Sequence, residues 1–319
     1  MKTILITGGA GFIGSHLCNR LLNNDYNVIC LDNLITSSDK NINHLIKQKN
    51  FNFIKADVCT LPDLSKDQID YIFHLASPAS PSIHSKISFI NLPYQTMMAN
   101  SVGTDNVLKL AQQKNSRFLF ASTSEIYGDP TIHPQPETYR GNVSTTGPRS
   151  VYDESKRFGE TITSYYQRHK NVDTRIARIF NTYGPNMSLE DKRVIVNFIS
   201  QALTNSPITI YGDGSQTRSL CYVSDMVDGL IKLMMTDNLS GEIINLGMPQ
   251  EMTVKKIAQL VKLTTKSKSN IVYNDKLPTD DPLLRKPDIN KAINLLNWQP
   301  RIDFQTGLLK TIEYVKSIL

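Results

Sequence analysis

The stretch TILITGGAGFIG, residues 3–14, decides the fold of this chain. Its first five residues form an apolar run that predicts a buried strand, and residues 12–22 continue with the apolar spacing of a helix. Gly8, Gly11 and Gly14 lie three residues apart where the strand would turn into the helix. Glycine allows a tight turn and close approach to a pyrophosphate, which backbone N–H groups and the positive helix end then hold. The stretch therefore predicts a dinucleotide-binding turn.

Short apolar runs alternate with longer amphipathic segments through the first 180 residues. Further buried strands are expected at residues 27–31, 51–56, 71–75, 117–122 and 174–180, and further helices at residues 94–114 and 152–169. Strand and helix in alternation predict an α/β fold, a Rossmann-type doubly wound parallel sheet with helices on both faces. Residues 1–180 are accordingly expected to form an NAD-binding domain that includes the helix at 152–169.

The regular alternation of apolar runs and amphipathic segments ends after residue 180. Short strands are expected at residues 208–211, 243–246 and 271–273, among helices at about 224–236, 253–264 and 304–318. We expect residues 181–319 to form mainly a smaller C-terminal α/β lobe that binds the substrate, with some crossing of the chain between lobes. No linker of low complexity separates the two parts, so a cleft between packed lobes is predicted.

Composition excludes several classes of protein. Of 319 residues, 40% are apolar and 20% are charged, which is typical of a globular protein and not of a disordered or fibrous one. The net charge of +6 is spread along the chain, so no nucleic-acid site is expected. No apolar run approaches the roughly 18 residues of a membrane span. The scattered cysteines form no C-x-x-C pair, so reduced thiols, no metal site and a cytoplasmic location are expected.

Acidic residues follow the second and third expected strands. Asp32 ends the strand after the glycine turn, where a carboxylate accepts hydrogen bonds from the ribose hydroxyls of NAD. It would repel a 2′-phosphate, so NAD is favoured over NADP. Asp57 is either an adenine contact or a surface carboxylate.

Tyr152 and Lys156 lie four residues apart and therefore on one face of an expected helix. By itself such a pair is also compatible with an amphipathic helix that carries an exposed lysine. Here it follows the dinucleotide turn and a strand that leads into Ser122-Thr123-Ser124-Glu125. The Lys156 ammonium and the oxidised nicotinamide would both favour the phenolate of Tyr152, which could take a proton from a substrate hydroxyl while hydride leaves for NAD. The residues expected at the cofactor are Gly8, Gly11, Phe12, Ile13, Gly14, Asp32, Asn33, Asp57, Val58, Leu75, Ala76, Tyr152 and Lys156.

Together these residues resemble the extended short-chain dehydrogenase/reductase family, whose members modify nucleotide sugars. More specific stretches resemble the UDP-glucuronate decarboxylases, or UDP-xylose synthases. These stretches are HLASPASP at 74–81, TSEIYGDP at 123–130, GPRSVYDE at 147–154, RIFNTYGP at 178–185, GSQTR at 214–218, and DDP at 280–282 followed by RKPD at 285–288. The resemblance covers essentially the whole chain.

The resemblance implies roles for four catalytic positions beside Lys156. Tyr152 would deprotonate the sugar hydroxyl on carbon 4, and Thr123 would bind the oxygen on that carbon. Glu125, or a water that it orients, would be the source of the proton for carbon 5. Ser124 stands where the related 4,6-dehydratases have an aspartate, which argues against water elimination. Arg285 would bind the substrate carboxylate, although a surface salt bridge is its alternative.

The resemblance also implies nucleotide-binding positions in the second lobe. Asn181 would contact the diphosphate, Arg218 would neutralise it, Arg193 is a further phosphate candidate, and Tyr211 would lie against the uracil. Each could instead be structural. The residues expected at the substrate are Pro78, Ser124, Asn181, Arg193, Tyr211, Arg218 and Arg285.

The implied activity is that of a carboxy-lyase. It would convert UDP-glucuronate to UDP-xylose through a 4-keto intermediate, with NAD regenerated in each cycle and the protein a homodimer. Alternatives are a 4-epimerase, a 4,6-dehydratase or, in another class, a non-catalytic NAD-binding protein. The chain departs from the decarboxylase pattern at Arg140, Ser144–Thr146, Ser155 and Asn186, close to the expected sugar pocket, which leaves the exact sugar nucleotide open.

Overall fold

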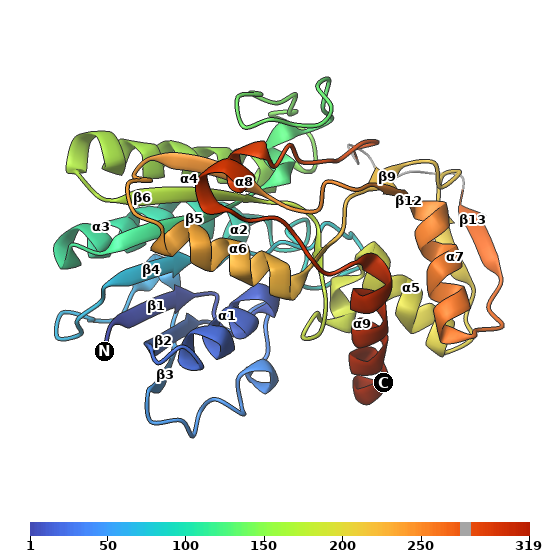
Figure 1. Ribbon diagram of the computed structural model, residues 1–319, viewed down its shortest axis with the longest axis horizontal. Helices are drawn as coiled ribbons and strands as arrows, with labels where there is room; N and C mark the ends of the chain where they lie inside the picture. The colour runs from blue at the N-terminus through green and yellow to red at the C-terminus, as the bar shows by residue number, and fades with distance from the viewer. Residues whose placement is uncertain (275–281) are drawn as a thin grey trace.

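The computed structural model describes residues 1–274 and 282–319. Seven parallel strands form its main sheet, in the order β11-β6-β5-β4-β1-β2-β3 (Figure 1). The strands are β1 (Thr3–Thr7), β2 (Asn27–Asp32), β3 (Phe51–Lys55), β4 (Tyr71–His74), β5 (Arg117–Thr123), β6 (Thr174–Ile179) and β11 (Glu242–Leu246). The sheet confirms the expected doubly wound α/β fold.

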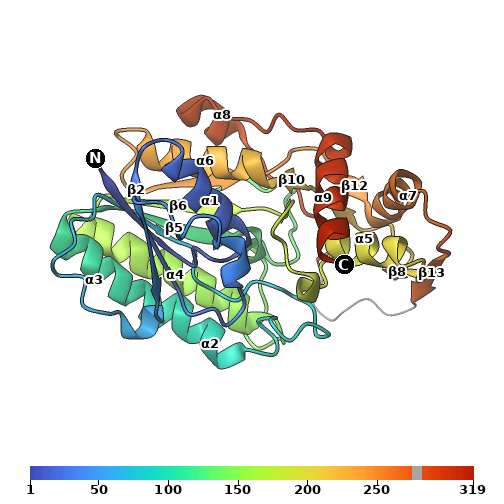
Figure 2. The same ribbon diagram turned by 90° about the horizontal axis from the view of Figure 1, so that it is seen from below.

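Helices cover both faces of this sheet (Figure 2). One face carries α1 (Phe12–Leu22) and α6 (Val223–Met235), and the other carries α2 (Pro93–Met98), α3 (Thr104–Lys114) and α4 (Ser150–Lys170). Successive side chains of a strand point to opposite faces, so Ile4 and Ile6 enter one apolar core and Leu5 enters the other. Because both faces are buried, the strands are continuous apolar runs.

A π-helical turn, Ala99–Gly103, separates α2 from α3, where the sequence predicts one continuous helix. Gly103 permits this turn to approach Val58, since a Cβ at Gly103 would lie 2.5 Å from Val58 Cγ2. Asn100 in the turn donates from Nδ2 to Ser155 Oγ on α4 at 3.0 Å. The π-helical turn therefore contacts both the segment at Val58, which follows β3, and α4, the helix that carries Tyr152.

The last strand of the main sheet comes from the second half of the chain. We expect residues 243–246 as a strand among the elements of the C-terminal lobe, but β11 pairs with β6 at the edge of the main sheet. A short buried apolar run fits any parallel sheet, so the sequence does not show which one it joins. The chain thus returns to the first lobe after residue 180 through α6 and β11.

The C-terminal lobe packs α5 (Val194–Leu203) against α7 (Val254–Thr265) and α9 (Phe304–Ile318). Its strands β8 (Ile208–Tyr211) and β13 (Ile271–Asn274) pair in parallel. The sequence did not predict α5, whose β-branched apolar residues are also typical of a strand. The remaining elements are α8 (Asn290–Leu296), β7 (Thr182–Tyr183), β9 (Thr217–Arg218), β10 (Cys221–Tyr222), β12 (Met252–Thr253) and the 3-10 turns Asp39–Asn41, Val58–Thr60, Ser124–Tyr127 and Leu189–Asp191.

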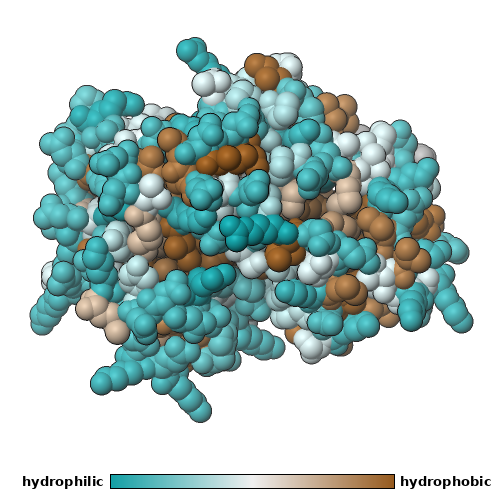
Figure 3. Space-filling view, viewed as in Figure 1, coloured by the Kyte–Doolittle hydropathy of each residue, from teal (hydrophilic) through white to brown (hydrophobic). Residues whose placement is uncertain are grey.

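Hydrophilic side chains cover most of the face seen in Figure 1, and apolar ones gather in smaller areas between them (Figure 3). Among the described residues, no helix is long and apolar enough to cross a membrane. The same residues include no group of three or more His, Cys, Asp or Glu side chains that could hold a metal ion. All four cysteines are free thiols.

Candidate active site

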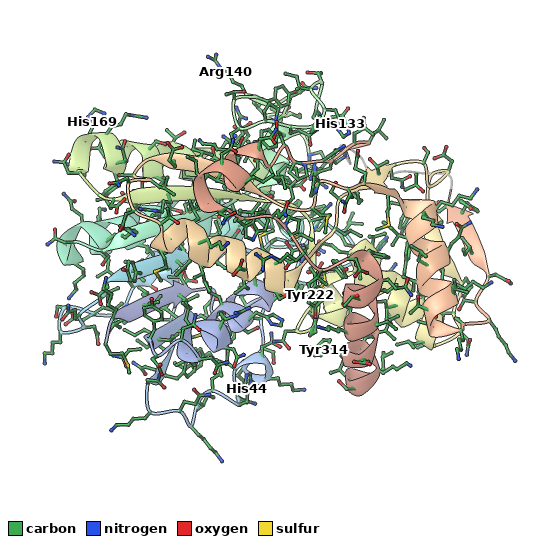
Figure 4. The ribbon with its side chains drawn as sticks, in the orientation of Figure 1. His44, His133, Arg140, His169, Tyr222 and Tyr314 are labelled. Atoms are coloured by element: carbon green, nitrogen blue, oxygen red, sulfur yellow. The ribbon has the colours of Figure 1, made fainter. Side chains whose placement is uncertain are left out.

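A cavity of about 890 Å³ opens at the carboxyl ends of the parallel strands. Its floor lies where the strand order reverses, because β1 is bonded to β2 on one side and to β4 on the other. Ligands of open α/β sheets bind at such a switch point. Asn181, Arg193 and Tyr314 from the second half of the chain also line the cavity, and Tyr314 lies on α9 (Figure 4). The expected cleft between the two parts is therefore present.

The glycine turn has the shape that a pyrophosphate requires. Gly8 has a φ of +71°, and a Cβ there would lie 2.8 Å from the backbone nitrogen of Ala76. A Cβ at Gly14 would lie only 2.1 Å from the carbonyl oxygen of Gly8. The turn thus brings the start of α1 against β1 so closely that only glycine fits at these positions, and the N-terminal end of α1, which begins at Phe12, lies at the cavity. The residues present fit a dinucleotide.

Asp32 is buried at the end of β2 and lines the cavity. Its carboxylate accepts hydrogen bonds from the backbone nitrogens of Ala10 at 3.0 Å and Leu34 at 2.8 Å, and from Ser37 Oγ at 2.7 Å. A carboxylate offers about four acceptor positions, so capacity remains for a ribose hydroxyl.

Asp57 follows β3 and lines the same cavity. It accepts from Asn33 Nδ2 at 2.7 Å and from the backbone nitrogen of Cys59 at 2.8 Å, and these bonds lower the pKa of Asp57 although burial opposes them. Every residue that the sequence predicts at the cofactor lines this cavity, namely Gly8, Gly11, Phe12, Ile13, Gly14, Asp32, Asn33, Asp57, Val58, Leu75, Ala76, Tyr152 and Lys156.

Tyr152 is buried on the first turn of α4. Burial raises the pKa of Tyr152, while a hydrogen bond with Thr123 and the positive charges of Arg193 and Arg149 oppose the rise. Burial also lowers the pKa of Lys156 to about 7, and its Nζ donates to the carbonyl oxygen of Ala121 at 2.8 Å. The two residues therefore lie together in a site that disfavours both charged forms: Lys156 loses its proton more readily than an exposed lysine would, whereas the phenolate of Tyr152, against the expectation from the sequence, is not favoured by this site alone.

An aromatic ring that the sequence did not single out covers Tyr152. Phe89 is buried and its ring stacks on that of Tyr152, with centroids 4.7 Å apart and planes 7° apart. The guanidinium of Arg149 lies 5.5 Å from the centre of the Phe89 ring. Because Phe89 excludes water from one face of the phenol, it strengthens the electrostatic influence of the neighbouring charges.

Glu125 lies between two arginines at the same end of the cavity. Its carboxylate accepts hydrogen bonds from Arg149 Nη2 on one side and from Arg285 Nη1 on the other. The side chains of Arg149 and Arg285 are buried, with exposed fractions of 7% and 4%, and that of Glu125 is partly buried, with an exposed fraction of 14%. Arg285 also donates to Ser124 Oγ at 3.4 Å, and burial lowers its pKa to about 9. We call Arg149, Glu125 and Arg285 the arginine–glutamate cluster.

The sequence predicted Glu125 and Arg285 but not Arg149. Arg149 is the N-cap residue of α4, just outside the helix that the sequence predicts over 152–169, so the spacing of apolar residues in that helix did not point to it.

The predicted substrate residues divide into two groups. Pro78, Ser124, Asn181 and Arg193 line the cavity. Among the described residues, Tyr211, Arg218 and Arg285 are not part of its lining.

Two of the predicted arginines form hydrogen bonds with residues near them in the chain. Arg193 donates from Nε and Nη2 to the Asp191 carboxylate at 2.6 Å each, and Arg218 donates to the Thr217 carbonyl oxygen at 2.8 Å. The residues 280 and 281 of the DDP stretch lie outside the described residues.

Comparison with known proteins agrees with this site. Residues 4–247 match the model of the NAD dependent epimerase/dehydratase family. UDP-glucuronic acid decarboxylase 1 of Danio rerio is 47% identical over 315 residues, which are 98% of this chain and 72% of that one. UDP-glucuronic acid decarboxylase 2 of Arabidopsis thaliana is 48% identical over 96% of this chain, which spans 66% of the plant protein.

A solved structure of UDP-glucuronic acid 4-epimerase from Bacillus cereus, in complex with UDP-glucuronic acid and NAD, is similar over 99% of this chain and all of that one. The sequence identity is 30% and the TM-score is 0.86. The match to a family of NAD-dependent enzymes confirms NAD as the expected cofactor. The glycine turn, the cavity at the switch point and the match over residues 4–247 lead to one conclusion: the chain belongs to the NAD-dependent epimerase/dehydratase family.

Proposed function

We propose that this protein converts UDP-glucuronate to UDP-xylose and carbon dioxide in an NAD-dependent decarboxylation. The observation that carries the proposal is the arginine–glutamate cluster beside Tyr152, in the cavity that fits a dinucleotide. A cavity-lining guanidinium, that of Arg149, at the end where the sugar reacts suits an acidic sugar, because arginine matches a carboxylate with paired donors. Relatives named UDP-glucuronic acid decarboxylase, 47% and 48% identical, support the same activity.

The first step is oxidation at carbon 4 of the sugar. Tyr152 takes the hydroxyl proton as general base, and Thr123, which is hydrogen-bonded to Tyr152, orients the oxygen. Lys156, held by the Ala121 carbonyl, lies next to the phenol, and its protonated form supplies positive charge there. NAD, when bound along the glycine turn, would accept the hydride from carbon 4 and would return that hydride to carbon 4 in the last step.

Decarboxylation follows from the ketone at carbon 4. The sugar is then a β-keto acid, and the C5–C6 bond breaks because its electrons delocalise into the ketone as an enolate. Thr123 and Tyr152 donate hydrogen bonds to the enolate oxygen, where negative charge develops. Tyr152 carries the proton that it took in the first step, so it is ready for this role.

Carbon 5 is then protonated. Glu125 accepts hydrogen bonds from two guanidiniums, an arrangement that stabilises its ionised form. An ionised carboxylate accepts but does not donate hydrogen bonds, so we assign Glu125 to holding the water that protonates carbon 5. Arg285 keeps Glu125 and Ser124 in position and adds positive charge opposite the departing carboxylate.

The nucleotide is assigned to the C-terminal side of the cavity. Asn181 and Arg193 line the cavity and are proposed to contact the diphosphate, and Pro78 is proposed to contact the sugar. Arg218 and Tyr211 are proposed to bind the phosphate and the uracil at the mouth of the site. Binding at these positions fixes the sugar against Tyr152.

A 4-epimerase is the second candidate function, and the similarity to the 4-epimerase from Bacillus cereus favours it. The first step would be the same, but an epimerase must rotate the keto sugar and must keep its carboxylate. The buried cluster at Glu125 favours the decarboxylase, because it fixes the carboxylate end of the sugar. A 4,6-dehydratase needs an acid at position 124, where this chain has serine.

The test incubates the purified protein with UDP-glucuronate, with and without added NAD, and follows the sugar nucleotide by mass spectrometry. Formation of UDP-pentose together with CO₂ is the expected result. A UDP-4-keto-pentose would show that the final reduction is missing. Conversion to an isomer of unchanged mass would establish the epimerase, and turnover of UDP-glucose or dTDP-glucose alone would establish another nucleotide-sugar enzyme.

We further propose a homodimer. Large apolar side chains are exposed on the outer faces of α2, the π-helical turn and α4, namely Tyr94, Met97, Val102, Phe158 and Tyr165. Such a group of exposed apolar side chains is typical of an interface. Phe158→Glu is expected to convert dimer to monomer in light scattering, and a monomeric wild type would contradict the proposal. The four free thiols favour a reducing compartment, so we propose a cytoplasmic location.

A further inference from the structure

The arginine–glutamate cluster contains two guanidiniums, and the structure distinguishes their tasks. We infer that Arg149 is the residue that binds the carboxylate of the acidic sugar, while Arg285 holds Glu125 from the opposite side. This inference rests on the proposed function and assigns the residue that makes the site specific for an acidic sugar.

The position of Arg149 is the first argument. The basic side chains that line the cavity, among the described residues, are Lys40, Arg149, Lys156 and Arg193. Lys40 lies in the 3-10 turn that follows β2, on the side of Asp32. Lys156 donates a hydrogen bond to the Ala121 carbonyl oxygen. Arg193 donates two hydrogen bonds to the Asp191 carboxylate.

Arg285 is not among the described residues that line the cavity. It contacts Ser124, Glu125 and the carbonyl oxygen of Gly128 from behind the 3-10 turn that starts at Ser124. Arg149 is therefore the lining guanidinium that reaches Glu125.

The chemistry of the sugar is the second argument. The oxygen on carbon 4 must reach Tyr152, and the carboxylate carbon is only two bonds from carbon 4. The carboxylate must consequently bind among the immediate neighbours of the Tyr152 hydroxyl. Arg149 precedes Tyr152 by three residues, and both side chains lie against the ring of Phe89. The positive charge of Arg149 also lowers the pKa of Tyr152 against the effect of burial.

Glu125 supplies the third argument. Its carboxylate already lies between two guanidiniums, so the site accommodates a carboxylate at this place. When the sugar carboxylate binds at Arg149, Glu125 keeps its bond to Arg285, and Asp153, 4.0 Å from Arg149 Nε, remains as a further carboxylate beside Arg149. After CO₂ has left, the pentose carries no carboxylate, so Glu125 pairs with Arg149 again and the acidic subsite is closed to the product.

The test measures binding without turnover. A Tyr152→Phe background prevents consumption of the ligand, NAD is present in excess, and calorimetry gives the affinities for UDP, UDP-glucose and UDP-glucuronate. The decisive quantity is the preference for UDP-glucuronate over UDP-glucose. We expect Arg149→Met to reduce this preference about ten- to hundredfold, the effect of one charge-assisted hydrogen-bonded pair.

Three further variants control the measurement. Arg149→Lys keeps the charge without the planar fork and should give an intermediate preference. Arg285→Met should change the preference less than Arg149→Met does. Arg140→Met removes an exposed arginine that lies at the outer edge of the molecule (Figure 4) and, against the expectation from the sequence, does not line the cavity; it should change nothing.

Affinity for UDP reports whether each variant is folded. If Arg149→Met keeps its UDP affinity and its full preference for UDP-glucuronate, the inference is wrong, and so it is if Arg285→Met alone abolishes the preference. Both results would leave the proposed function intact. If Arg149→Met no longer binds UDP, the Arg149→Lys variant decides, and an unchanged preference there overturns the assignment. A parent protein without any preference for UDP-glucuronate would overturn the proposed function together with the inference.

Discussion

The buried Lys156 makes the stability of the protein depend on pH in a predictable way. Its pKa is lowered to about 7 in the folded protein, from an ordinary value of 10.5, because burial removes water from the ammonium. Between these two values the unfolded chain holds a proton that the folded protein has released. Stability therefore rises with pH in this window, and it does so because of Lys156.

The size of the effect follows from the two pKa values. Each pH unit across which the unfolded state carries one extra proton is worth about 1.4 kcal/mol. Lys156 is half titrated at pH 7 in the folded protein, so the gain from pH 7 to pH 9 is about 2 kcal/mol. Replacement by Met removes the titrating group. The difference in free energy of unfolding between wild type and Lys156→Met should thus shift by about 2 kcal/mol in favour of wild type over this range.

The assay is urea denaturation of the NAD-free protein at several pH values from 6 to 9. Subtracting the variant from wild type cancels the contribution of all other titrating groups and the constant effect of lost packing. Lys109→Met is the matched control, because the Lys109 side chain is 58% exposed on α3 and should give a flat difference. A flat difference for Lys156→Met as well, or one that falls with pH, would refute the reasoning that burial discharges this lysine.

Three further predictions concern the chemistry. Tyr152→Phe should lower turnover of UDP-glucuronate by about 10²–10⁴-fold while binding measured by calorimetry persists, and near-normal turnover would contradict the role of general base. Gly14→Ala places a Cβ 2.1 Å from the Gly8 carbonyl oxygen, so NAD affinity should fall at least about tenfold in a calorimetric titration; an unchanged affinity would argue against the glycine turn as the phosphate site. Glu125→Gln should let reduced cofactor accumulate in a single turnover, because carbon 4 is still oxidised while later steps slow; a time course like that of wild type would show that Glu125 has another task.

Local signals made most of the fold predictable. A glycine turn is a property of consecutive residues, so the turn at residues 3–14 could be predicted. The strands of the first lobe could also be predicted, because strands buried on both faces of a parallel sheet are continuous apolar runs. The π-helical turn was not, because it depends on the close approach of Gly103 to Val58 from another part of the chain. The placement of β11 also depends on tertiary contacts, since its five residues would suit either lobe.

The candidate site was predictable where spacing in the chain reflects proximity in space. Tyr152 and Lys156 share a helix face, and every expected cofactor residue lines the cavity. The three residues of the arginine–glutamate cluster come from separate segments of the chain, so their spacing in the sequence does not predict that they meet. Arg285 was predicted only from the resemblance to a family. Phe89 was missed because a single phenylalanine in a loop carries no sequence signal for the ring on which it stacks.

The return of the chain to the main sheet through β11 has a consequence for any attempt to divide this protein. A fragment that ends at residue 180 would keep the glycine turn, Tyr152 and Lys156, yet it would lack α6 and β11. Its β6 would become an edge strand with unpaired backbone groups, and the sheet face beneath α6 would be exposed to water. Such a fragment should aggregate, so the half that contains the cofactor turn can be made only together with the half that follows it.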